Sequence, residues 1–200
     1  MKTPLQYQMT EYDCGPVCVF NALRYLFERA QIPPTLPHEI ALRTLDACNR
    51  RGEAGRGGTS KRAMCELSDW LNAFAAANDF PLRTEYLSGA EADASQTSRI
   101  AEALRAGGVA ICRVMYACWH YVLLNGLEGD TATMFDPYLR TIPYRKAGIE
   151  VIWDSPTINR RVDFSHLDAE GKSIYALGPR ARREVILLFN TQKSEDNDGK

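Results

Sequence analysis

The sequence of 200 residues lacks an excess of charge, a long apolar run and an apolar N-terminal segment. Its 24 basic and 25 acidic residues leave a formal net charge of −1, which gives no sign of bulk attraction to nucleic acid or to an anionic membrane. No apolar run approaches the roughly 20 residues that a spanning helix needs. The first 13 residues lack the apolar core of a secretory signal. We therefore expect a cytoplasmic protein with no membrane segment and no nucleic-acid partner.

Metal and phosphate motifs are also missing. The six cysteines include no CxxC pair, and without a secretory signal we expect most of them to be reduced. Cys112, Cys118 and His120 come nearest to a zinc site, but their spacing is unusual for one. The glycine-rich stretch 51–60 has Gly58 where a phosphate loop needs lysine, so we interpret it as a mobile loop that could flank a substrate groove. No cofactor and no metal are expected.

The hydrophobic pattern changes from helical to extended along the chain. Helical periodicity predicts helices over 14–28, 38–47, 59–78 and a short stretch containing Ile100 and Leu104. Compact apolar runs predict strands at 109–115, 120–125, 131–136, 149–153 and 184–189, with a short extended piece at 82–87 and a loop with a helical turn at 156–182. This order predicts an α+β fold in which N-terminal helices pack on a C-terminal antiparallel sheet. We expect one domain over 1–190 and a disordered polar tail at 191–200.

The stretch QMTEYDCGP places Cys14 at the start of the first helix, with Asp13 as its cap. The thiolate is the reactive form of cysteine, and the N-terminus of a helix favours negative charge. Gly15 would let a substrate backbone approach the sulfur. Taken alone, however, Cys14 is more readily explained as a buried core residue. Cys18, one helical turn later, has the same interpretation, with an oxidative partner for Cys14 as the alternative.

A catalytic cysteine needs a base, and the chain has only three histidines. The strands at 120–125 and 131–136 flank a glycine-bearing turn; if it is centred near Glu128, His120 lies opposite Asp136. Opposed residues have Cβ atoms about 4.5–5.5 Å apart, so the carboxylate could orient the ring while its other nitrogen accepts the thiol proton. The alternative is an ordinary polar cross-strand pair, and a one-residue slip would separate the two. His166 is a fallback base, and His38 is expected to be solvated.

Gln8 adds a fourth element. Its side-chain amide and the backbone N–H of Cys14 could bind the oxyanion of a tetrahedral intermediate. A lone glutamine is more often a solvated surface residue, but the agreement of Gln8, Cys14, His120 and Asp136 favours a catalytic site. Arg180, Arg182 and Arg183 are interpreted as a solvated basic patch.

These residues resemble a known family. QMTEYDCGPVC is similar to the N-terminal motif of the C39-type, papain-like cysteine peptidases, and HYVLLNGLEGDTATMFDPY is similar to their second motif. GGTSKRAMCELSDWL resembles the middle helix of the family, and the similarity spans roughly 8–137. On this resemblance the family's Cys, His, Asp and Gln map onto Cys14, His120, Asp136 and Gln8.

The resemblance implies a papain-like α+β fold and thiol-dependent cleavage of a peptide bond in a peptide or protein substrate. The best-known relatives are peptidase domains of ABC transporters that clip leader peptides after a double glycine in the cytosol. No transporter follows here, so the closer likeness is to free-standing C39-like proteins. The alternatives are acyl transfer to an amine by the same triad and a non-catalytic peptide-binding module. Residues 140–190 have no counterpart in the motifs, and no role is predicted for them.

Overall fold

A computed structural model describes residues 4–192, and a seven-stranded antiparallel sheet forms its centre. The strands are β1 (Leu82–Ser88), β2 (Val109–Tyr116), β3 (Cys118–Glu128), β4 (Thr131–Phe135), β5 (Ile149–Val151), β6 (Arg160–Asp163) and β7 (Glu184–Asn190). Their order across the sheet is β1-β7-β2-β3-β4-β6-β5. The helices are α1 (Cys14–Leu26), α2 (Thr35–Arg43), α3 (Lys61–Ala77), α4 (Arg99–Arg105) and α5 (Phe164–Leu167), with short 3-10 turns at Arg29–Gln31, Gly89–Glu91 and Arg180–Arg182. The predicted α+β class is confirmed.

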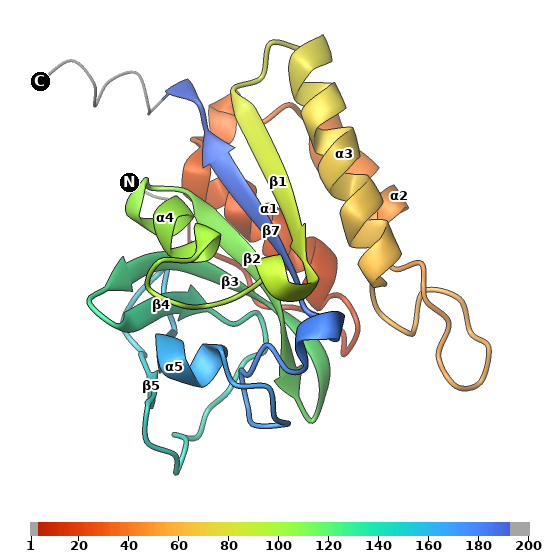
Figure 1. The fold of residues 1–200 in the computed structure, drawn as a ribbon. Coiled ribbons are helices and arrows are strands. Elements are labelled where there is room, and N and C mark those ends of the chain that lie inside the picture. Colours follow the sequence, from red (N-terminus) through yellow and green to blue (C-terminus); the bar gives the residue numbers. More distant parts are fainter. Residues whose placement is uncertain (1–3, 193–200) are drawn as a thin grey trace, which may run out of the picture.

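Helices cover both faces of the sheet. The helices α1, α2 and α3 lie on one face, and Figure 1 shows α3 running beside β1. The helices α4 and α5 pack on the opposite face. Alternate residues of β3 divide between the two cores: Tyr121 and Leu123 join the first, and Val122 and Leu124 join the second. This division follows from the alternation of side chains along a strand.

Most helix ends follow the sequence signals. The helix α1 begins at Cys14 as predicted, and the Ser60 hydroxyl caps α3 by accepting a hydrogen bond from the Ala63 amide at 3.1 Å. Gly107 ends α4 with φ +78, the left-handed conformation that glycine favours. The helix α2 begins three residues earlier than predicted and ends at Arg43. Leu45 at φ +58 follows its end, and this backbone conformation does not continue a helix.

One strand is new. The segment 156–182 was predicted to be loop with a helical turn; the turn is α5, but Arg160–Asp163 forms β6 between β4 and β5. No helix among residues 4–192 is long and apolar enough to cross a membrane. The predicted disordered tail lies, from residue 193 onward, outside the described residues.

Candidate active site

The start of α1 is packed against two loop segments. The Asp13 carboxylate does not cap the helix through its side chain. Instead it accepts hydrogen bonds from the amides of Met9 (3.1 Å) and Thr10 (3.0 Å), which folds the preceding segment back onto the helix start. On the other side, a Cβ added to Gly15 would come within 2.5 Å of the Thr59 hydroxyl oxygen. Glycine at this position is therefore needed for packing against Thr59.

Cys14 is buried, with 7% of its surface exposed, at the first position of α1. Cys18 is fully buried in the same core, where burial first and then the nearby Cys14 raise the pKa of its thiol well above the ordinary value. All six cysteines are free, and Cys48 and Cys118 are exposed. Cys18 is therefore a core thiol, as its spacing predicts.

His120 interacts with both Asp136 and Cys14. Its Nε2 is 2.8 Å from Asp136 Oδ1, and both side chains are buried. Burial alone would lower the pKa of the imidazole, but the hydrogen bond to Asp136 and the interaction with the Cys14 side chain outweigh it and raise the pKa to about 10. Because Asp136 occupies Nε2, the nitrogen available to Cys14 is Nδ1.

A β-bulge makes this pairing possible. Near the turn, Gly126 pairs with Thr133; this register, continued inward, would set Asp136 opposite Leu123 and on the other face from His120. The register shifts between Leu124 and Gly126, and beyond the shift Leu123 pairs with Phe135. The predicted register was wrong by two residues, since it paired Leu123 with Thr133. An offset of two residues keeps side chains on the same face, and so Asp136 still reaches His120 diagonally.

Residues from the C-terminal third surround Asp136. Asn159 forms two hydrogen bonds with the Asp136 backbone, each 2.7 Å long. Its Oδ1 accepts from the Asp136 amide, and its Nδ2 donates to the Asp136 carbonyl. The Tyr175 hydroxyl donates to Asp136 Oδ2 at 2.6 Å, and the Tyr138 amide donates to Oδ1 at 2.8 Å. Arg160 Nη2 lies 4.0 Å from Oδ2. Sequence reasoning missed these residues, because Asn159 and Arg160 lie in a polar stretch that is typical of a loop.

Gln8 lies on the segment that precedes α1. Its amide nitrogen Nε2 donates to the Thr10 carbonyl at 2.7 Å, and its backbone amide donates to the Pro137 carbonyl at 2.9 Å. The second bond ties this segment to the residue after Asp136. The side-chain oxygen Oε1 is buried and has no hydrogen-bond partner among residues 4–192. The amide nitrogen carries two N–H groups, and the bond to Thr10 uses one of them, so the other remains for another acceptor.

Other candidates from the sequence lie elsewhere. His166 donates from Nε2 to the Ile174 carbonyl at 2.5 Å, which ties it to a loop, and His38 is exposed in α2. Within residues 4–192 no group of three or more His, Cys, Asp or Glu side chains could hold a metal ion. The prediction of a solvated arginine patch is wrong for Arg183, which is fully buried and paired with Asp168.

Hydrogen bonds to Ala47 close the base of the glycine-rich loop, and the loop contacts the segment that precedes Cys14. The Ala47 amide donates to the Gly58 carbonyl at 3.2 Å, and the Gly57 amide donates to the Ala47 carbonyl at 2.9 Å. Gly58 has φ +86, a conformation that favours glycine, and a Cβ there would lie 3.6 Å from the Tyr12 carbonyl oxygen. The loop therefore packs beside the segment that carries Cys14.

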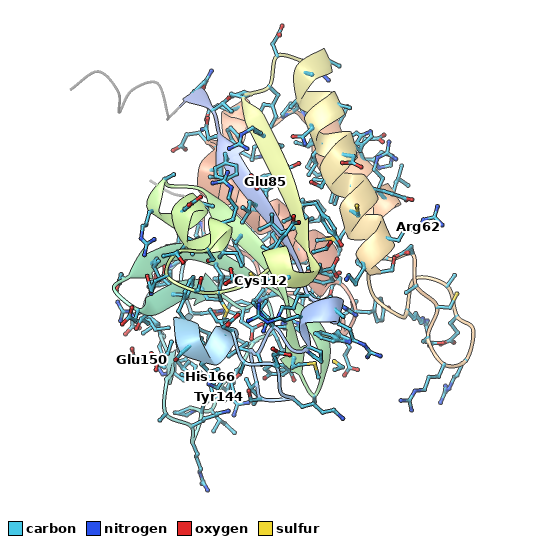
Figure 2. The ribbon with its side chains drawn as sticks, viewed as in Figure 1. Arg62, Glu85, Cys112, Tyr144, Glu150 and His166 are labelled. Carbon is cyan, nitrogen blue, oxygen red and sulfur yellow. The ribbon has the colours of Figure 1, made fainter. Side chains whose placement is uncertain are left out.

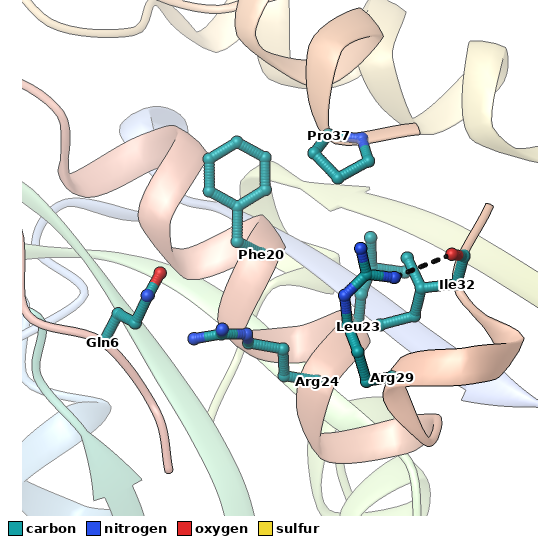
Figure 3. Close-up of a pocket in the computed structure, with 7 residues that line it drawn as sticks. All are labelled: Gln6, Phe20, Leu23, Arg24, Arg29, Ile32 and Pro37. Carbon is teal, nitrogen blue, oxygen red and sulfur yellow. Dashed lines mark hydrogen bonds between the residues drawn. The ribbon is translucent and has the colours of Figure 1, made fainter. Parts of the chain in front are cut away.

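A separate cavity of about 260 Å³ lies along α1 (Figure 3). It is lined by Gln6, Phe20, Leu23, Arg24, Arg29, Ile32 and Pro37. Arg29 Nη1 donates to the Ile32 carbonyl at 3.2 Å across one side of it. None of the candidate catalytic side chains contributes to this cavity.

Comparison with known proteins gives structural neighbours only. No family model and no curated protein matches the chain. One similar solved structure is a double glycine motif protease from an AMS/PCAT transporter in complex with the leader peptide; identity is 18%, the TM-score is 0.42, and the match covers 94% of this chain and 90% of that one. Another is the peptidase domain of Streptococcus ComA, a bifunctional ABC transporter involved in a quorum sensing pathway, with 14% identity, a TM-score of 0.43 and coverage of 93% and 97%.

Proposed function

We propose that residues 1–190 form one papain-like, C39-type cysteine peptidase domain that acts in the cytoplasm on a peptide or protein substrate. The observation that carries the proposal is the position of His120, which is bonded to Asp136 at 2.8 Å and interacts with the Cys14 side chain. Sulfur, imidazole and carboxylate in this order are the parts of an activated nucleophile. The motifs around Cys14 and His120 support the same assignment.

In the proposed reaction Cys14 attacks the carbonyl carbon of the scissile peptide bond. His120 holds the thiol proton and then gives it to the leaving amine as the carbon–nitrogen bond breaks, which leaves an acyl-enzyme. Water then attacks the acyl carbon, its proton passes to His120, and the Cys14 sulfur leaves. Asp136 keeps the His120 ring oriented throughout.

The oxyanion of each tetrahedral intermediate needs donors already in place. The backbone N–H of Cys14, at the first position of α1, is one proposed donor. The remaining N–H of the Gln8 amide is the other. The hydrogen bond from the Gln8 backbone to the Pro137 carbonyl supports this role because it ties Gln8 to the strand end that carries Asp136.

Thiol labelling tests the proposal. Cys14 is buried while Cys48 and Cys118 are exposed, so accessibility alone would make Cys14 react more slowly with iodoacetamide. An activated thiolate reverses this order, and we expect Cys14 to label roughly tenfold faster than Cys48 at pH 7. His120→Ala should abolish this advantage, whereas His38→Ala, at an exposed histidine, should keep it.

Equal rates at all cysteines, or faster labelling of Cys48 and Cys118, would contradict the proposal.

Product analysis with and without added amines separates hydrolysis from acyl transfer, because the amine intercepts the same acyl-enzyme. Full biological activity of Cys14→Ala would favour a binding module instead.

A further inference from the structure

We propose that Tyr175 is a positioning residue for the catalytic carboxylate, and that Arg160 fixes the direction of its hydroxyl group. This inference rests on the proposed function and extends it, because it assigns a role to the segment 140–190. Both side chains lie outside the motifs around Cys14 and His120. Both are almost completely buried, at 0% and 1% exposure.

The carboxylate of Asp136 has two oxygens with different tasks. Oδ1 accepts from His120 and from the Tyr138 amide, each at 2.8 Å. Oδ2 accepts from the Tyr175 hydroxyl at 2.6 Å, the shorter length of a charge-assisted O–H···O bond. The Arg160 nitrogen Nη2 lies 4.0 Å from Oδ2, beyond direct hydrogen-bond distance. Tyr175 is therefore the direct partner that holds the far oxygen.

Arg160 directs the Tyr175 proton toward Asp136. Arg160 Nε donates to the Tyr175 oxygen at 3.1 Å, and the Tyr144 hydroxyl lies 2.8 Å from it. A phenol has one proton and two lone pairs, and an ionised carboxylate can only accept. Because Arg160 donates to the Tyr175 oxygen and Asp136 can only accept, Tyr175 gives its single proton to Asp136. Figure 2 shows Tyr144 on the side of the sheet that carries α5.

The backbone at Tyr175 is strained in a way that serves this contact. Its φ is +64, a left-handed conformation that is rare for a bulky side chain. The strained residue is held at both ends, since the Tyr175 amide donates to the Met115 carbonyl and the Met115 amide donates to the Ala176 carbonyl, each at 2.8 Å. Strain of this kind persists where the surrounding structure enforces it and is concentrated at functional sites. Here it places a hydroxyl against Asp136.

The consequence for the reaction is orientation. Without the hydroxyl, Oδ2 would be buried with no hydrogen-bond donor, and the carboxylate would gain by turning toward Arg160. That rotation would move Oδ1 away from His120 Nε2. His120 would then lose the main interaction that keeps it charged and aligned with Cys14.

The test compares Tyr175→Phe with Tyr86→Phe. Each change removes one hydroxyl that donates to a carboxylate, at Asp136 and at Glu184 respectively, and keeps the ring. NMR titration of the His120 ring and the pH profile of Cys14 alkylation are measured on both variants and on the wild type. In Tyr175→Phe we expect the His120 titration to move to lower pH by about one unit, a tenfold change in proton affinity, and the part of the Cys14 alkylation profile that depends on the His120 charge to move with it. Tyr86→Phe should leave both unchanged.

Arg160→Lys is the second variant, in case Tyr175→Phe does not fold. It keeps the charge but removes the Nε donor, so the same shifts are expected at smaller size. An unchanged His120 titration and unchanged Cys14 labelling in a folded Tyr175→Phe or Arg160→Lys variant would overturn the inference. Wild-type Cys14 labelling no faster than Cys48 would instead count against the proposed function, and the His120 titration would still decide the role of Tyr175.

Discussion

Raising the pH should weaken the folded state through His120. The pKa of its imidazole is about 10 in the folded protein, against roughly 6.5 in an unfolded chain. A group whose pKa is higher in the folded state contributes stability in full below the unfolded pKa and loses it as the pH rises through the folded pKa. The window is therefore pH 6.5 to 10. At about 1.4 kcal/mol for each pKa unit, the difference gives an upper limit of about 5 kcal/mol.

Urea unfolding across this pH range measures the effect. Burial also raises the pKa of other groups, Cys112 and Tyr121 among them, and these weaken the fold at high pH as well. The informative quantity is therefore the difference in unfolding free energy between the wild type and His120→Gln, with His38→Gln as the control at an exposed histidine. We expect this difference to shrink by several kcal/mol between pH 6.5 and pH 10, within the limit set above. Parallel curves for the wild type and His120→Gln would refute the reasoning.

Two further substitutions test how close packing and burial stabilise the fold. Gly15→Ala should cost about 1–3 kcal/mol in urea unfolding because its Cβ would overlap the Thr59 hydroxyl, whereas Gly171→Ala, which has open space, should be near neutral; equal midpoints would contradict this. Arg183→Gln should cost about 1–3 kcal/mol because it removes a fully buried guanidinium and leaves the carbonyl oxygens of Gly178 and Asp168 without their donor. Arg180→Gln, at an exposed pair, should cost at most about 1 kcal/mol, and a similar loss in both would show that burial does not set the difference.

Local sequence signals predicted the helices and most of the strands because they depend on nearby residues. Ser60 and Gly107 act at the ends of their own helices, and the branched apolar residues at 109–115 favour the buried strand that forms there. The contact between His120 and Asp136 could be predicted from the sequence for a related reason. A short turn limits the register of the two strands it joins, and an error of two residues preserves the face.

The support for Asp136 could not be predicted in this way. Arg160 opens a charged stretch that is typical of a loop, yet it is buried in β6 because Tyr175 and backbone carbonyls satisfy its guanidinium. Tyr175 reaches Asp136 from 39 residues away through a strained backbone that no local pattern marks. The packing of Gly15 against Thr59 could not be predicted either, since Thr59 lies in another loop. Each of these features depends on long-range packing.

The central claim is that Cys14 cleaves peptide bonds with the help of His120 and Asp136. The most direct measurement is the cleavage profile of a diverse peptide library by the wild type and by Cys14→Ala, with Cys48→Ala as a matched control at an exposed cysteine. The account predicts cleavage by the wild type and Cys48→Ala at a shared set of sites, and none by Cys14→Ala. Cleavage that survives in Cys14→Ala would contradict it.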